Sequence, residues 1–383
     1  MLGRAERLGI SVVLAAAAAL AASGAAVASA SVVVPCAAGG AGLVAAVNTV
    51  NAAGGGSITL AAGCTYTLTT RDNPAMGGNG LPVVVTPVTI NGRGATVAGN
   101  STNFRIVAVD GTSGGALTVN DLTITGGRVL GAMAAGAGAG ILNLSGTLTL
   151  NRVVVTGNYA ADAGGGVANA FGATATLNQS DVSWNTVPAT GSGGGGILGL
   201  ASTLQLNNSI VEHNSGPGGG GIASGNGMGG GPGSSITLNR SLIRDNTAAG
   251  APESGGGGIS NGGTLVSNNS VIVGNAAPGE VGGGLLNHAT ATLNNTVVAQ
   301  NSAAGGLGGG IMNAIFFAGQ PTPTLVLNNG AVTGNSAAAG GGIVNVSFDP
   351  TVPAGTVTLR NTAVTGNTPD NCEPPGSIAG CSG

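Results

Sequence analysis

The chain contains no lysine and few charged or aromatic residues of any kind. Charged residues make up 6% of its 383 residues and aromatic residues 2%, and the formal net charge is −3. The few arginines are spread along the sequence and form no basic stripe, which excludes nucleic acid as a partner. The low charge also excludes the charge-rich type of intrinsic disorder. The 76 glycines follow no Gly-X-Y period, so the chain is not a collagen.

Recognisable catalytic and metal-binding motifs are missing as well. There is no HExxH, no CxxC pair, no Walker motif, no GxSxG and no calcium-binding nonapeptide. The two histidines, His213 and His288, lie on repeats three apart, which argues against a shared metal ion. We therefore expect no catalytic set, no cofactor and no metal site.

The first thirty residues have the pattern of an export signal. Arg4 and Arg7 form a short basic start, residues 10–22 are apolar, and an A-x-A cleavage pattern ends at Ala30. After Ala30 no apolar run approaches the ~18 residues that a membrane span requires. We predict a signal peptide over 1–30, with an uncleaved membrane anchor as the alternative. The mature chain is then secreted or at the cell surface and has no transmembrane span.

Two short motifs alternate along most of the remaining chain. The first is a glycine triplet followed by Ile, Val or Leu; after a weaker copy at Gly140-Ile141 it occupies 164–167, 194–197, 219–222, 256–259, 282–285, 308–311 and 340–343. The second is Leu-Asn, a short strand, and then an aliphatic residue followed at the third position by Asn. Its copies end at Asn158, Asn185, Asn214, Asn246, Asn275, Asn301, Asn335 and Asn367.

This repeat predicts a solenoid of coils of roughly 25 to 35 residues. Each unit offers three short strands, which cannot stand alone but pair with their equivalents in the next coil about 4.8 Å away. Less regular strands are expected upstream, at 57–60, 66–69, 83–90, 104–109 and 116–125. An amphipathic helix over 42–53 would cap the open end of the stack.

The Gly-Gly-Gly-Ile and [Val/Ile]-x-x-Asn motifs resemble the repeats of polymorphic outer-membrane proteins, within the pectin-lyase-like superfamily. The opening from Cys36 to Leu68 and the ending from Asn371 to Cys381 are also similar to those of secreted bacterial β-helix proteins. This resemblance implies an all-β, single-stranded, right-handed parallel β-helix. Here Val or Ile replaces the family's Phe, which thins the core. No autotransporter-type barrel follows the last coil, so plain secretion is favoured.

The expected organisation is a single β-helix over 31–383 after the signal peptide. It comprises a cap and first coil (31–70), irregular coils (71–130), eight regular coils (131–367) and a disulfide-closed tail (368–383).

The four cysteines lie at the two ends of the expected stack. Cys36 and Cys64 bracket the first coil, and Cys372 and Cys381 follow the last. Roughly ten rungs of about 4.8 Å separate the ends, far beyond the ~7 Å Cα limit of a disulfide. Within one chain only Cys36–Cys64 and Cys372–Cys381 can form.

The first asparagine of the second motif recurs at one corner of every coil but the last. Stacked amides can hydrogen-bond to each other along the stack. We predict an asparagine ladder of Asn151, Asn178, Asn207, Asn239, Asn268, Asn294 and Asn328.

When the coils are aligned on this motif, two outward columns carry ionisable and aromatic residues on three consecutive coils only. These residues are Trp184, Glu212, His213, Arg244 and Asp245. One interpretation is a solvated face with two surface ion pairs beside an exposed aromatic. A second is a ligand-binding patch on which a glycan stacks against Trp184. A third is a hydrolase or lyase site that uses Glu212 and Asp245.

Three functions follow from these interpretations. The first hypothesis is a non-enzymatic secreted or surface protein acting in adhesion, or in binding glycan or cell-envelope material. The second is a polysaccharide lyase or glycoside hydrolase of the pectin-lyase-like superfamily, and the third is a purely structural surface protein. The fold alone does not decide among them, and the sequence does not indicate an oligomeric state.

Overall fold

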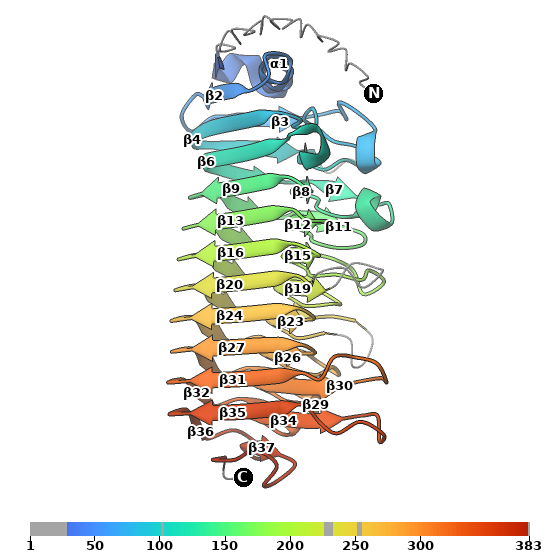
Figure 1. The fold of residues 1–383 in the computed structure, drawn as a ribbon. Coiled ribbons are helices and arrows are strands. Elements are labelled where there is room, and N and C mark those ends of the chain that lie inside the picture. Colours follow the sequence, from blue (N-terminus) through green and yellow to red (C-terminus); the bar gives the residue numbers. More distant parts are fainter. Residues whose placement is uncertain (1–28, 101–102, 226–232, 251–254, 382–383) are drawn as a thin grey trace, which may run out of the picture.

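The chain folds into an all-β parallel solenoid of about 11 turns. The computed structural model describes residues 29–100, 103–225, 233–250 and 255–381. Figure 1 shows the strands stacked as a column, with one α-helix over the N-terminal end. The predicted parallel β-helix with an N-terminal cap is thus confirmed. Nearly all of the expected signal peptide lies outside the described residues, and no described helix is both long and apolar enough to cross a membrane.

Each regular coil contributes one strand to each of three faces. The first face is built from β9 (Thr147–Asn151), β13 (Thr174–Asn178), β16 (Thr203–Asn207), β20 (Ser235–Asn239), β24 (Thr264–Asn268), β27 (Thr290–Asn294), β31 (Thr324–Asn328) and β35 (Thr356–Arg360). The second comprises β10 (Val154–Thr156), β14 (Asp181–Ser183), β17 (Ile210–Glu212), β21 (Leu242–Arg244), β25 (Val271–Val273), β28 (Val297–Ala299), β32 (Ala331–Thr333) and β36 (Ala363–Thr365).

The third face begins at the glycine triplets. Its strands are β5 (Val107–Asp110), β8 (Ile141–Leu144), β12 (Val167–Ala170), β15 (Ile197–Leu200), β19 (Ile222–Gly225), β23 (Ile259–Asn261), β26 (Leu285–Asn287), β30 (Ile311–Ile315), β34 (Ile343–Ser347) and β37 (Cys372–Glu373). Between the second and third faces lie short extra pairs: β7 (Arg128–Val129) with β11 (Tyr159–Ala160), β18 (Ser215–Gly216) with β22 (Thr247–Ala248), and β29 (Ser302–Leu307) with β33 (Ser336–Ala339).

Equivalent residues of successive coils pair in register, and this builds the core. Leu150, Leu177 and Leu206 follow one another along the first face and are fully buried. On the second face Val155 pairs with Val182 in the same way. Aliphatic columns therefore fill the interior from one end to the other, as the repeat predicts.

The N-terminal coils differ from the expected ones in their boundaries. The cap α1 (Gly39–Ala52) begins three residues earlier than predicted, because the 3-10 turn η1 (Cys36–Ala38) leads straight into it. An unpredicted strand, β1 (Ala30–Val34), pairs with β2 (Gly56–Leu60) beneath the helix. The strand expected at 66–69 is β3 (Thr65–Leu68), and that at 116–125 is β6 (Ala116–Thr125).

Two upstream strands were placed too early in the sequence. The strand expected at 83–90 is β4 (Pro87–Gly99), which bends around the corner with a register shift after Asn91 and so belongs to both the first and second faces. The strand expected at 104–109 is β5, because Phe104 makes only an isolated bridge. Short 3-10 turns η2 (Ala75–Gly77), η3 (Gly111–Ser113) and η4 (Met133–Gly136) complete this region.

Both ends of the stack carry a disulfide. Cys36 is joined to Cys64 with their Cα atoms 5.6 Å apart, and Cys372 to Cys381 with their Cα atoms 6.3 Å apart. The first links the capping segment to the first coil, and the second closes the tail that follows the last coil. These are the two pairs that the stacking geometry allows.

Candidate functional site

Every regular coil leaves the second face through one residue in the left-handed backbone region. Four coils have glycine there, at Gly157, Gly274, Gly334 and Gly366, whereas the others have Trp184, His213, Asp245 and Gln300, with φ of 52° to 56°. A side chain in this conformation costs ~1–2 kcal/mol relative to the right-handed one, a cost that glycine escapes. Three consecutive coils thus hold large side chains at a position where half of the coils use glycine.

Trp184 forms the aromatic part of the site. Its ring stacks on that of His213, with centroids 4.3 Å apart and an angle of 23° between the planes. In the preceding coil Gly157 occupies the equivalent position and has no side chain. Trp184 is 62% exposed. A flat apolar surface therefore remains open beside a position without a side chain.

Glu212 and Arg244 form the charged part of the site. They are paired across β17 and β21, and both Nε and Nη2 of Arg244 lie 2.5 Å from Oε2 of Glu212. The carboxylate of Asp245 is 3.9 Å from the same guanidinium. The side chain of Glu212 is only 13% exposed, while those of Arg244 and Asp245 are 42% and 43% exposed. The pairing holds Glu212 in place and leaves two polar groups open to solvent.

Asp181, which the sequence analysis missed, is the third acidic residue of this region. It begins β14, and its neighbour two residues on, Ser183, pairs directly with Glu212. Burial raises the pKa of Asp181 above its ordinary value, and the nearby Glu212 adds to this rise against the opposing effects of Ser183 and Arg244. Its Oδ1 is buried without a hydrogen-bond partner among the described residues. In the other coils this position is aliphatic, and that contrast was the signal available in the sequence.

The structure thus brings together all five residues predicted for the patch and adds Asp181. We call these six residues the Trp184 patch: Trp184, Asp181, Glu212, His213, Arg244 and Asp245. They come from three successive coils on the second face and its left-handed corner. The patch combines an aromatic surface, a guanidinium and three carboxylates. Within the described ranges, no group of three or more potential ligands is arranged to hold a metal ion.

Two other clusters of interacting side chains lie outside the patch. Asp121 and Arg152 form an exposed bidentate ion pair, which lowers the pKa of Asp121. His288, Phe316 and Phe348 form an aromatic row, with successive ring centroids 5.1 Å apart. Neither cluster joins an aromatic face to several polar groups, as the Trp184 patch does.

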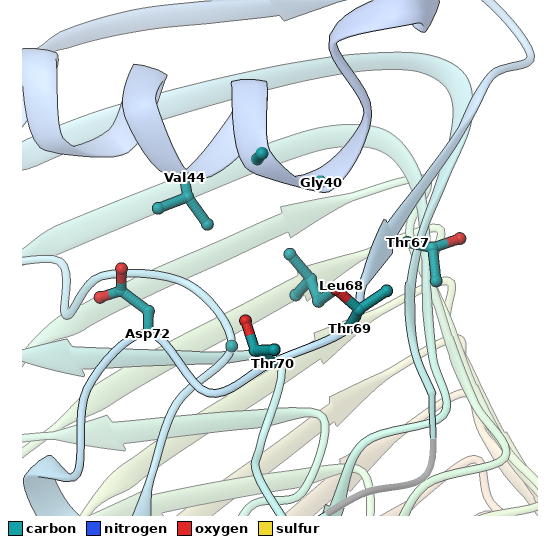
Figure 2. A pocket seen from close by; sticks show the side chains of 9 residues that line it. Gly40, Val44, Thr67, Leu68, Thr69, Thr70 and Asp72 are labelled. Carbon is teal, nitrogen blue, oxygen red and sulfur yellow. The ribbon is translucent and has the colours of Figure 1, made fainter.

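A hollow of about 190 Å³ lies between α1 and the end of β3 (Figure 2). The residues that line it include Thr67, Thr69, Thr70 and Asp72, and Val44 of the helix lies over it. This lining contains no aromatic surface and no base beside a nucleophile. We assign no chemistry to this hollow.

Asparagine rows hold the coil corners beside the patch in place. The outer ladder runs from Asn151 to Asn328, with each Nδ2 donating to Oδ1 of the preceding member at 2.8 to 3.0 Å. It continues beyond its predicted start to Asn120 and Asn91. A second row, the inner asparagine row, is formed by the last Asn of each motif and runs from Asn158 to Asn367.

The inner asparagine row also explains the third glycine of each triplet. Each of its members from Asn185 to Asn367 lies against the third glycine of a triplet, where a Cβ would come within about 3 Å of the amide. Gly221, for example, abuts Asn246 in this way. The two motifs that alternate in the sequence therefore meet in space.

Comparison with known proteins adds little to this picture. No protein-family model matches the chain, and no curated protein matches its sequence. Among solved structures it is similar to the crystal structure of pectate lyase Pel9A, with 13% sequence identity and a TM-score of 0.41, over 82% of this chain and 72% of that one. At this level the likeness bears on neither site nor activity. The resemblance to polymorphic outer-membrane-protein repeats stays a prediction.

Proposed function

We propose that this chain is an exported, non-enzymatic β-helix that binds a glycan through the Trp184 patch. The observation that carries the proposal is the contiguity of the patch, in which the exposed ring of Trp184 stacks on His213 next to the Glu212–Arg244 pair. In the other regular coils the left-handed corner column and the outward column before it contain no charged or aromatic side chain. The indole offers a stacking surface to a sugar ring, while Arg244 and the carboxylates can bond its hydroxyls.

The column also supplies matched variants for a test. Gln300 has the same left-handed backbone but lies two coils beyond the patch. Trp184→Gly and Gln300→Gly therefore make the same backbone change inside and outside the site. On a glycan array, the parent should bind a defined set of glycans, Gln300→Gly should bind the same set equally, and Trp184→Gly should lose it.

Two results would contradict this proposal. If the parent bound no glycan, the patch would be a solvated face of a structural protein. If Trp184→Gly retained the parent's binding, the site would lie elsewhere on the molecule.

Cleavage of a polysaccharide is a second candidate, which the environment of Asp181 favours. A carboxyl with a raised pKa beside another acidic residue is the arrangement from which glycosidases draw their general acid. The purified protein would then release sugar ends or unsaturated products from a polysaccharide that it binds. Asp181→Asn should abolish this release while leaving binding in place, whereas a parent that releases nothing is a binding protein only.

Export rests on the N-terminal pattern and on the two disulfides, which persist in oxidising compartments. Mass spectrometry of the mature protein tests it. The expected first residue is Ser31, and a mature chain that retains residues 1–30 would support the membrane-anchor alternative.

A further inference from the structure

The outward side chains of the first face form a regular array of threonines. In β9 to β31 the second and fourth residues are buried, so the first and third residues point outward. The first positions are Thr147, Thr174, Thr203, Ser235, Thr264, Thr290, Thr324 and Thr356. The third positions are Thr149, Thr176, Gln205, Thr237, Val266, Thr292, Val326 and Thr358. We call these two columns the threonine face.

Strand propensity alone does not require this uniformity. The second face is built from strands of the same coils, yet its outward positions hold Asp181, Glu212 and Arg244 besides aliphatic residues, three threonines and a serine. The threonine face contains no charged and no aromatic side chain over eight coils. Where threonine is replaced, two of the substitutes are valines, which keep the branched shape.

The array is also held in a regular arrangement. The strands from β9 to β35 pair over five residues each without any register shift, and Figure 1 shows them stacked parallel to one another. The outer asparagine ladder runs along one border. Among these threonines, within the described residues, the one side-chain hydrogen bond joins Thr356 to Thr324, at 3.5 Å. The other hydroxyls face solvent, each with one donor and two acceptor sites.

The spacing of this array follows from strand geometry. Neighbouring strands are about 4.8 Å apart, and residues two apart along a strand are about 6.6 Å apart. Tetrahedrally bonded water with an O···O distance of about 2.75 Å has second neighbours about 4.5 Å apart and a two-layer repeat of about 7.3 Å. When the fit is centred on the array, the mismatch of about 0.3 Å per rung displaces the outermost rows by about 1 Å, which is less than a quarter of the lattice repeat.

We propose that the threonine face binds ice. Ice is an uncharged solid, and this face carries no charge that would have to lose its hydration on contact. Because the array is rigid, many weak hydrogen bonds can form together, although a single hydroxyl would bind ice too weakly. Sugar rings stack on aromatic side chains, and none lies on this face, so we favour ice over a polysaccharide surface. This activity is independent of the Trp184 patch, which lies on the second face.

The experiment measures freezing-point hysteresis and the partition of the protein into a growing ice crystal. The parent should show both. Thr264→Tyr, and Thr290→Tyr in the next strand, place a bulky ring in the middle of the array and should lose most of each signal. Thr333→Tyr makes the same substitution on the outward side of β32 and should keep it, as should Trp184→Gly. Circular-dichroism melting shows that each variant is folded.

Three outcomes would overturn the proposal. The first is a parent that shows neither hysteresis nor partition into ice. The second is a loss in folded Thr333→Tyr as large as that in folded Thr264→Tyr and Thr290→Tyr, which would show that the threonine face is not the binding surface. The third is a parent that sediments with crystalline cellulose or chitin but is excluded from ice.

Discussion

Replacing Asn246 by alanine should destabilise the protein far more than the same change at Asn239. Asn246 is fully buried in the inner asparagine row. Its Nδ2 donates to the carbonyl of Val211 and to Oδ1 of Asn275, both at 2.9 Å. Its Oδ1 accepts from the backbone N–H and from Nδ2 of Asn214, both at 3.0 Å. Alanine removes all four bonds.

The cost follows from the partners that are left behind. The N–H of Asn214 and the carbonyl of Val211 lose these bonds inside the stack, and each buried group left unsatisfied costs ~1–3 kcal/mol. We expect a loss of about 4 kcal/mol for Asn246→Ala. Asn239 in the outer ladder is half-buried and has one side-chain bond to each neighbouring member. Water can replace these bonds, so Asn239→Ala should cost ~1 kcal/mol.

Urea unfolding of the two variants and the parent, followed by circular dichroism, measures this difference. Because the stability of a solenoid is a sum over coils and their interfaces, the comparison should use midpoints from identical conditions. Equal midpoint shifts for Asn246→Ala and Asn239→Ala would refute the reasoning, since the inner row would then contribute no more than the outer one.

Three further predictions concern the stability of variants at single positions. In thermal melting, Gln300→Gly should stabilise the fold by ~0.5–1 kcal/mol, because glycine adopts the left-handed backbone without strain. Trp184→Gly should have nearly the stability of the parent, because the same relief is offset by the loss of the ring contact with His213. Burial lowers the pKa of His288 to about 4. Because the unfolded chain therefore binds a proton at a higher pH than the folded chain, the free energy of unfolding should fall by up to ~3 kcal/mol as the pH drops from 6.5 to 4. The urea midpoint of His288→Gln should lack this dependence on pH. Because the pKa of Asp181 is raised, its charged form opposes folding, so Asp181→Asn should raise the melting temperature at pH 7, and this gain should shrink in acid.

The repeat made the coil register predictable from the sequence. Fixed spacing within each motif copy places Val155, Val182 and their equivalents in one column, and only stacking can bury such a column. The same spacing placed the outer ladder and five of the six residues of the Trp184 patch. The limits of the ladder were not predictable, because Asn91 and Asn120 precede the regular repeats and their alignment depends on the bend in β4.

The direction of the second asparagine was not predictable in the same way. By strand alternation alone, the residue three after the inward Val155 would point outward. The left-handed residue between them, Gly157, resets the alternation and turns Asn158 inward. Asp181 was missed because it precedes Val182 in β14, whereas the two outward columns that predicted the patch both follow this residue.

Trp184 is the chain's single tryptophan, so its fluorescence reports on the proposed glycan site directly. Titrating the parent with an oligosaccharide that it binds on the array tests the central claim. We predict a saturable change in the intensity or wavelength of the emission, with a midpoint equal to the affinity measured by calorimetry, and the same change in Gln300→Gly. Calorimetric binding without any change in the emission of Trp184 would contradict the account, because the glycan would then bind away from the patch.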